Sequence, residues 1–397
     1  MNIGILTHHW VYNFGANLQT LSTVGFIEKS GHTPFVINWI PQDSEIDYSQ
    51  STLPSQVSCF KEFQKQYMPL TALCRTTEDI AAIIRKYNIE RVIIGSDTVF
   101  KLRKEHFSIK KFKNIPPRFN NTFPNPFWGD FLNWNISPSI RAYSAATFDT
   151  NPHQFDNKKN EIKAALLKFE KISVRDNATQ NFISYFTDQK IIPEITPDPV
   201  FGFNNNITRI ITKEEITRRF NLPENYVLAC FTEYYKTKIN SWVQKLADKL
   251  QKGYNLPLYE LPRQTGEQLL NIKQITPNNI TPLEWYYIIK YSKGYIGQLM
   301  HPIIVAMHNV VPFYCMDYYG LRKFKGFNID HTTSKVYQIV KSADMLNRYC
   351  HIGEYFSTLP DIDIVLDKLF QRDLEKRLAW SRNKQEESFN SMKKIIL

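Results

Sequence analysis

The chain has 397 residues, of which 43% are hydrophobic and 22% are charged, and its formal net charge is +11. This length favours two domains over a single core, and the apolar runs are far shorter than the roughly 20 residues of a membrane span. The five cysteines include no Cys-x-x-Cys pair, so neither a disulfide framework nor a thiolate zinc site is indicated.

The amino-terminal segment predicts a strand, a polar loop and a helix. Residues Ile3–Leu6 form the apolar strand, His8 and His9 follow in the loop, and the helix is expected from about Leu18. Such an arrangement directs backbone N–H groups and the positive end of the helix at one place. This segment therefore suits an anionic or polyhydroxylated ligand.

Strands and helices alternate through the rest of the first half. The strand at 91–94 ends in Gly95, Ser96 and Asp97. Because ligands of open parallel sheets bind outside the carboxyl ends of the strands, we expect these residues on the same rim as the first loop. Further strands are expected at 35–38, 143–146 and 171–175, and helices at 78–87, at 161–170 and after the capping residue Asp176.

A linker is predicted at 193–206, where Pro193, Pro197, Pro199 and a run of asparagines disfavour regular structure. The alternation then resumes, which predicts an α/β fold with two Rossmann-like domains and a cleft between them. The predicted domains are 1–203 and 204–370, and a carboxyl-terminal helix, 371–397, is expected to pack back on the first domain. The second half contributes strands at 226–231, 258–259, 294–297 and 311–315, with helices at 239–250, 282–291, 302–308 and 363–397.

A basic segment, 101–113, leads into a segment rich in proline and aromatic residues, 116–134. In one interpretation the basic residues are solvated and the aromatic side chains fill the core. In the other, this region forms a surface that meets a lipid-linked saccharide at the membrane. No nucleic-acid-binding motif accompanies the charge, so we expect no nucleic-acid partner.

Two motifs carry a family resemblance. The first is the run Asn13–Gln19, and the second is Tyr295–Pro302, which is followed by an Ala-containing helix and Val311–Phe313. In this order they resemble the polysaccharide pyruvyl transferases, which build pyruvate ketals on sugars from phosphoenolpyruvate. The chain departs from the family pattern at Gln298, usually Ser, and at Pro302, commonly Gly. The resemblance implies two Rossmann-like halves arranged as in the glycosyltransferase B fold.

The resemblance also implies a donor side. It nominates His301 as a catalytic residue, at a strand-to-helix junction where the helix terminus favours anions and tunes the imidazole. Phosphoenolpyruvate carries a phosphate and a carboxylate, which call for cationic and amide groups. The residues nominated to bind it are Arg175, Gln298, Arg322 and Lys323.

These donor-side nominations have structural alternatives. Arg175 is equally compatible with an ion pair that ties its strand end to Asp176 or Glu170. The segment 317–323 is compatible with a solvated loop.

On the acceptor side, the resemblance nominates residues whose amide and hydroxyl groups pair with sugar hydroxyls, and Asp97 as a catalytic base. Simple turn geometry is the alternative for Gly15, and helix capping is the alternative for Asp97. The residues nominated to bind the acceptor are Asn13, Gly15, Gln19 and Ser96, together with His8 and His9 at the end of the first strand.

The expected activity is transfer of pyruvate from phosphoenolpyruvate, a co-substrate, to a polysaccharide or lipid-linked precursor. No step of ketal formation obliges a metal or a bound cofactor, so we expect neither. The opening Met1–Gly4 lacks a secretion signal, so we expect the protein in the cytoplasm, at the inner membrane face where the acceptor is lipid-linked. A nucleotide-sugar glycosyltransferase of the same fold and a non-catalytic carbohydrate-binding relative remain alternatives.

Overall fold

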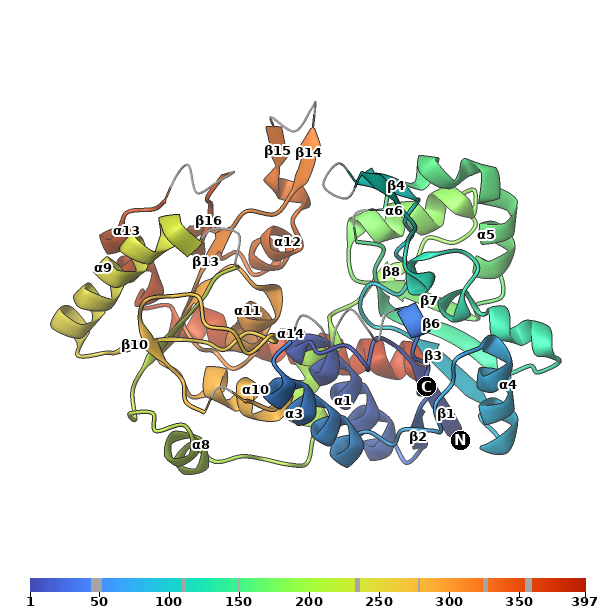
Figure 1. The fold of residues 1–397 in the computed structure, drawn as a ribbon, viewed down its shortest axis with the longest axis horizontal. Helices are drawn as coiled ribbons and strands as arrows, with labels where there is room; N and C mark the ends of the chain where they lie inside the picture. The colour runs from blue at the N-terminus through green and yellow to red at the C-terminus, as the bar shows by residue number, and fades with distance from the viewer. Residues whose placement is uncertain are drawn as a thin grey trace. The chain divides into compact units, whose positions relative to one another are not determined.

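The computed structural model describes residues 1–43, 52–108, 112–148, 150–232, 236–277, 279–323, 328–353 and 359–397. The chain forms two compact units, each built around its own parallel sheet (Figure 1). Unit 1 contains Met1–Ser51, Lys61–Thr208 and Glu386–Leu397, and unit 2 contains Thr52–Phe60 and Arg209–Gln385. The chain therefore passes between the units four times, twice inside a helix. No helix in the described ranges is both long and apolar enough to cross a membrane.

The sheet of unit 1 has six parallel strands in the order β2-β1-β3-β6-β7-β8. Its four central strands are largely buried, as their apolar sequences predict for a sheet covered on both faces, whereas the edge strands β2 and β8 are partly exposed. The strand order reverses between β1 and β3, which makes that position the topological switch point of the sheet. The strands are β1 (Asn2–Leu6), β2 (Thr33–Val36), β3 (Arg91–Ile94), β6 (Ser139–Ala145), β7 (Lys171–Val174) and β8 (Glu194–Ile195).

The first helix begins earlier than its sequence predicts. Helix α1 starts at Phe14, because the side chain of Asn13 accepts a hydrogen bond from the Ala16 N–H at 3.1 Å and caps the helix there. The expected start near Leu18 was wrong, whereas Asp176 caps its helix as predicted. The helices of this unit are α1 (Phe14–Lys29), α4 (Thr77–Lys86), α5 (Lys159–Leu166), α6 (Asn177–Phe186) and α7 (Phe203–Asn206), with the second part of α3 (Pro54–Tyr67).

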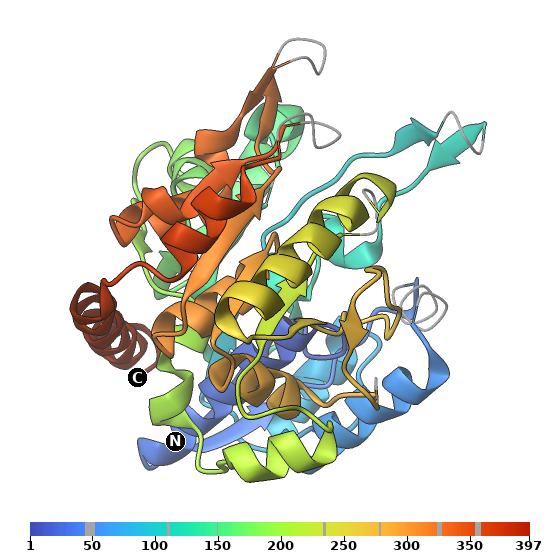
Figure 2. The same cartoon turned by 90° about the vertical axis from the view of Figure 1, so that its left-hand side faces the viewer.

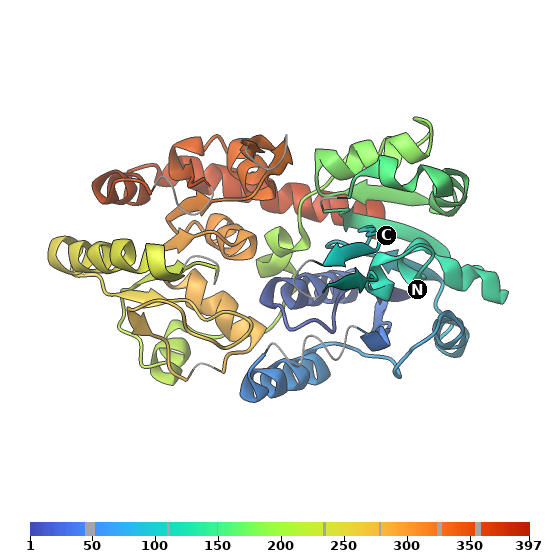
Figure 3. The ribbon, with the colours of Figure 1, turned by 45° about the horizontal axis from the view of Figure 1, so that its top comes forward.

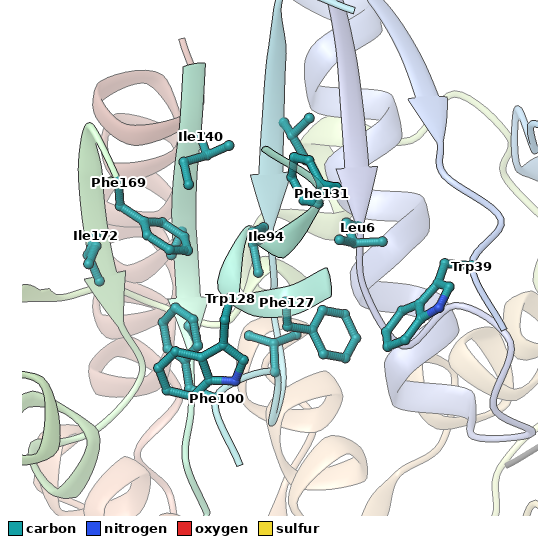
Figure 4. Packing of buried hydrophobic residues seen from close by; sticks show 14 of the residues in the cluster. Leu6, Trp39, Ile94, Phe100, Phe127, Trp128, Phe131, Ile140, Phe169 and Ile172 are labelled. Atoms are coloured by element: carbon teal, nitrogen blue, oxygen red, sulfur yellow. The ribbon is translucent and has the colours of Figure 1, made fainter. Parts of the chain in front are cut away.

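The main core of unit 1 lies between the sheet and the aromatic segment that follows β5. Phe127, Trp128 and Phe131 are almost completely buried and pack with residues of the strands and of α4, α5 and α6 (Figure 4). Much of the segment 116–134 therefore fills the core, as one of the two interpretations predicts. The segment 101–113 contributes instead a small antiparallel hairpin of β4 (His106–Ser108) and β5 (Lys113–Ile115).

The segment predicted as a linker is packed structure. The Ser22 hydroxyl donates to the Pro199 carbonyl at 2.7 Å, and Asn206 Nδ2 donates to the Ser22 hydroxyl at 2.9 Å. A Cβ on Gly25 would lie 2.3 Å from the Asn206 carbonyl oxygen, so only glycine permits this approach of α1 and α7. The prolines and asparagines of 193–206 therefore shape short turns against α1, and the chain passes into unit 2 just after them, between Thr208 and Arg209.

The end of the chain also belongs to unit 1. Helix α14 (Leu374–Ile396) contributes its last residues there. Arg91 Nη1 donates to the Leu397 carbonyl at 2.6 Å, and Arg141 Nη1 donates to the Ile395 carbonyl at 3.1 Å. These contacts fix the end of α14 on the sheet strands β3 and β6.

The sheet of unit 2 also has six parallel strands, in the order β11-β10-β9-β12-β13-β16. This is the Rossmann order, with its switch point between β9 and β12. The strands are β9 (Val227–Cys230), β10 (Leu258–Glu260), β11 (Lys273–Gln274), β12 (Gly294–Gly297), β13 (Phe313–Asp317) and β16 (Tyr349–His351).

Helices cover both faces of this second sheet. On one face α9 and α13 lie side by side (Figures 1 and 3), joined by an ion pair of 2.6 Å between Lys249 and Asp363. Elsewhere α10 and α11 pack together, and the Tyr286 hydroxyl lies 2.9 Å from His308 Nε2. The helices are α8 (Lys213–Arg219), α9 (Lys236–Tyr254), α10 (Pro282–Lys290), α11 (Met300–His308), α12 (Lys335–Ser342), α13 (Ile362–Leu369) and the first part of α14, and β14 (Leu321–Lys323) and β15 (Asn328–Asp330) form a hairpin.

Candidate functional site

The loops that follow β1 and β3 meet at the switch point of unit 1. The Thr7 hydroxyl donates to the Ser96 carbonyl at 3.1 Å, so the two loops are joined directly. The first loop is also fixed by Asn17, whose Nδ2 donates to the Val11 carbonyl at 2.8 Å, and by Gln64, whose Nε2 donates to the His9 carbonyl at 2.8 Å. The structure thus brings together the two loops that the sequence placed on one rim.

The motif Asn13–Gln19 forms the beginning of α1. Asn13 is its capping residue, and Gly15 is buried in its first turn. Gln19 is almost completely buried, and its Nε2 donates to Asp198 Oδ2 at 2.5 Å. The amide of Gln19 is therefore engaged with a buried carboxylate inside the protein.

Arg175 lies between two carboxylates. Its Nη1 is 3.3 Å from Asp198 Oδ2, and its Nη2 is 3.4 Å from Asp97 Oδ1. Burial by itself lowers the pKa of Arg175, but the charges of Asp97, Asp198 and Asp176 outweigh it, and the net pKa is raised. The side chain is 6% exposed, so its charge is held inside the protein by this pairing. The sequence offered Asp176 or Glu170 as the ion-pair partner of Arg175, but neither of these residues makes the contact.

Asp97 has an unusual backbone conformation. Its φ is +75°, a region that Asp adopts more readily than most residues, and its carbonyl accepts from the N–H groups of Val99 and Ala146. Just before it, a Cβ on Gly95 would lie 2.5 Å from the Tyr143 carbonyl oxygen. The Asp97 side chain is 23% exposed. Of the two carboxylates that pair with Arg175, that of Asp97 is therefore accessible to solvent.

Ser96 is almost fully buried, and its hydroxyl has no hydrogen-bond partner among the described residues. The hydroxyl beside Asp97 thus has an unused donor but is covered by neighbouring atoms, and its role in acceptor binding stays a prediction.

The two histidines after β1 are interior residues. His9 is held on both ring nitrogens, with Nε2 3.0 Å from Asn38 Oδ1 and Nδ1 3.2 Å from the Thr7 carbonyl. His8 packs edge-on against Phe127, with ring centroids 4.8 Å apart, and burial lowers its pKa although the charge of Asp97 opposes this. Burial likewise lowers the pKa of His9. His8 therefore lies near Asp97, whereas both nitrogens of His9 serve to shape the loop.

In unit 2, Gln298 bridges the switch point between β9 and β12. Its Oε1 accepts from the Thr232 N–H at 2.9 Å and from the Thr232 hydroxyl at 3.2 Å. Gln298 is fully buried, and in the described part of the chain its Nε2 has no hydrogen-bond partner. The neighbouring Gly297 is required by close packing, since a Cβ there would lie 2.3 Å from the Cys230 carbonyl oxygen.

His301 lies in the first turn of α11, directly after this junction. The helix begins at Met300 after Leu299, which offers no side-chain cap, and the His301 side chain is half-buried. The first N–H groups of α11 and its positive end are thus near an imidazole at the carboxyl edge of the sheet. His308 lies at the other end of α11 and is interior, and burial lowers its pKa to about 3.

Arg322 and Lys323 lie in strand β14, which pairs with β15 in a hairpin where the sequence predicted a loop. Their side chains lie outside the described residues, so their donor-binding role stays a prediction.

Sequence reasoning missed Asp198 and Thr232. Asp198 accepts hydrogen bonds from Gln19 and from the Val200 N–H, but its position between two prolines indicated a linker. Thr232 follows an apolar strand and carries no motif of its own. Only the strand order, which places β9 beside β12, relates it to Gln298.

Comparisons with solved structures identify the fold. A UDP-N-acetylglucosamine 2-epimerase of Neisseria meningitidis, solved with UDP-N-acetylglucosamine, has a TM-score of 0.53 and 11% identity over 100% of this chain and 98% of its own. A candidate UDP-N-acetylglucosamine 2-epimerase of Listeria monocytogenes has a TM-score of 0.55 and 10% identity over 98% of this chain and 93% of its own. Such similarity shows the fold alone, and it confirms the predicted α/β fold of glycosyltransferase B type with two Rossmann-like sheets.

The sequence itself identifies the family. No curated protein matches the chain significantly. The family model described as polysaccharide pyruvyl transferase, however, matches residues 13–319, from the capping residue of α1 to the loop after β13. That span contains most of the chain and both motifs described above. The chain therefore belongs to the polysaccharide pyruvyl transferase family and is a transferase.

Proposed function

We propose that this protein transfers pyruvate from phosphoenolpyruvate to two hydroxyl groups of a saccharide and forms a cyclic ketal. The observation that carries this proposal is the position of the motif residues in each sheet. Ser96 and Asp97 follow β3 at the switch point of unit 1, and Gln298 and His301 follow β12 at the switch point of unit 2. In open parallel sheets, such positions are where ligands bind.

His301 is suited to the donor. The reaction requires a proton at the methylene carbon of phosphoenolpyruvate, attack of one sugar hydroxyl on the resulting cationic carbon, loss of phosphate and attack of the second hydroxyl. An imidazole titrates near neutrality and can transfer such protons. The uncapped beginning of α11 next to it favours a phosphate or a carboxylate.

Asp97 is suited to the acceptor. As a carboxylate it can accept a proton from a sugar hydroxyl, and the neighbouring Ser96 hydroxyl can pair with a second one. Arg175 donates hydrogen bonds to both Asp97 and Asp198, and Gln19 donates a further one to Asp198. In this proposal Gln19 positions the charged cluster, and Arg175 either does the same or releases a carboxylate when the anionic donor binds.

Two other functions make different predictions. A nucleotide-sugar glycosyltransferase would bind a UDP-sugar, such as the ligand in the Neisseria epimerase structure, whose likeness to this chain extends to the fold alone. A non-catalytic relative would bind saccharide and turn over neither donor. We place the active protein in the cytoplasm, where its acceptor is a polysaccharide or a lipid-linked precursor.

The test is a pair of measurements on the full chain. We expect phosphoenolpyruvate to raise the melting temperature and UDP-N-acetylglucosamine to leave it unchanged, because only a bound ligand stabilises the folded state. In the second measurement, phosphate release with a saccharide acceptor should fall at least about hundredfold in His301→Ala, the scale of a lost acid–base catalyst. His153→Ala, at a histidine whose side chain is 68% exposed, is the matched control. Unchanged phosphate release in His301→Ala would refute the catalytic role.

A further inference from the structure

We propose that the β4–β5 hairpin is a membrane-docking arm that places Phe107 and Phe112 in the headgroup region of an anionic bilayer. The hairpin extends from unit 1 as a narrow pair of strands (Figure 2). This inference does not depend on the transferred group, because it rests on the hairpin alone.

Two phenylalanines of the hairpin are exposed without a packing role. Phe112 is 84% exposed and Phe107 is 56% exposed, and their rings contact each other edge-on with centroids 5.7 Å apart. The nearby segment buries Phe127 and Trp128 almost completely, so aromatic side chains from this region do enter the core. The two hairpin rings instead form an apolar tip in water, which is costly unless a partner covers it.

The hairpin and the segment that leads into it are strongly basic. Between Lys101 and Lys113 the sequence has six basic residues and one acidic residue, Glu105. Among the described residues of this stretch, Arg103, Lys104 and Lys113 are exposed. Anionic lipid headgroups attract such side chains, and each contributes roughly a fivefold gain in membrane affinity. The charge thus complements an anionic bilayer, while the rings supply the apolar contact that holds a protein at its surface.

The chemistry of the tip favours lipid over saccharide. Carbohydrate sites combine an aromatic face with side chains that pair with hydroxyls, in both donor and acceptor roles. At this tip the two rings are phenylalanines, which carry no polar group, and they contact each other instead of presenting an open face. Lysine ammonium groups only donate, which suits phosphate better than a neutral sugar.

The first test is sedimentation of the full chain with vesicles. We expect binding to phosphatidylcholine vesicles that contain about 30% phosphatidylglycerol and little binding to phosphatidylcholine alone. Binding should weaken strongly in about 0.5 M NaCl, because salt screens the charge.

Variants separate the apolar and the charged contributions. Phe107→Ser with Phe112→Ser should weaken binding about tenfold or more, and Lys104→Ser with Lys113→Ser should weaken it roughly twentyfold. Matched controls are Ile210→Ser, at a residue 70% exposed in unit 2, and Lys252→Ser, at an exposed lysine of α9. We expect both controls to bind as the parent does.

The outcomes distinguish this inference from the proposed function. Pyruvyl transfer to a water-soluble acceptor should be unchanged in the Phe107→Ser, Phe112→Ser variant. Binding to anionic vesicles that survives both double substitutions would overturn the inference. A raised KM for the soluble acceptor in the Phe107→Ser, Phe112→Ser variant would also overturn it, because the hairpin would then be a saccharide-binding element.

Discussion

Arg175 provides a quantitative test of the charged cluster in unit 1. Replacing it by methionine keeps much of the side-chain volume and removes the charge that faces Asp198, a carboxylate only 1% exposed, at 3.3 Å. Removing one partner of a buried ion pair destabilises proteins by about 3–5 kcal/mol. Asp97 adds little to this, because it is 23% exposed and water can solvate it. Asp198 also keeps its hydrogen bonds to Gln19 and Val200, so we expect the lower end, about 3 kcal/mol.

Hydrogen exchange measured by mass spectrometry localises this loss. Exchange of amides in β7 and α1 should accelerate roughly hundredfold, since about 1.4 kcal/mol corresponds to a factor of ten. Peptides of β9 and β12 in unit 2 are the internal reference and should not change. Adding Asp198→Asn to Arg175→Met should recover about 1–2 kcal/mol, because the unpaired buried charge is then gone. Acceleration below about fivefold in β7, or no recovery in the double variant, would contradict the assignment of Arg175 as a buried bridge.

Three further changes test other parts of the structure by urea unfolding. Gly25→Ala should cost about 1–3 kcal/mol, because the new Cβ collides with the Asn206 carbonyl; a loss near zero would show that α1 and α7 pack more loosely. His308 is buried and neutral, with its pKa lowered to about 3, so the unfolded chain binds its proton first and stability should fall by about 2 kcal/mol from pH 7 to pH 5. A His308→Gln variant with the same pH slope would contradict this. Gln298→Leu should cost about 1–3 kcal/mol by leaving the Thr232 N–H without its acceptor, and a loss near zero would show that this hydrogen bond does not stabilise unit 2.

Regular parts of the fold were predictable from local patterns. Short apolar runs such as 91–94 and 294–297 could only be buried parallel strands in an alternating α/β sequence, and both are. The start of α1 and the packed structure of the segment 193–206 were not predictable from such patterns, because helix capping and packing outweighed composition there. The strands β4 and β14 are three residues long and too short for any periodicity to show.

The residues of the candidate site could be nominated from the sequence, but the contacts that they make could not. Asn13 and Asp97 could be nominated because the segments that contain them resemble the family pattern. The partners of Arg175 lie 23 and 78 residues away in sequence, and only the strand order brings them together. Gln19 is an example. Its amide could pair with sugar hydroxyls, but in the folded chain it donates a hydrogen bond to the buried carboxylate of Asp198.

The central claim is tested most directly by reacting the purified chain with phosphoenolpyruvate that is labelled with ¹³C at its second carbon, in the presence of a saccharide from the host cell. The account predicts a new ketal carbon resonance on the saccharide, with one phosphate released for each ketal formed, and no ketal in His301→Ala. Label that stays in phosphoenolpyruvate, while a UDP-sugar is consumed under the same conditions, would contradict it.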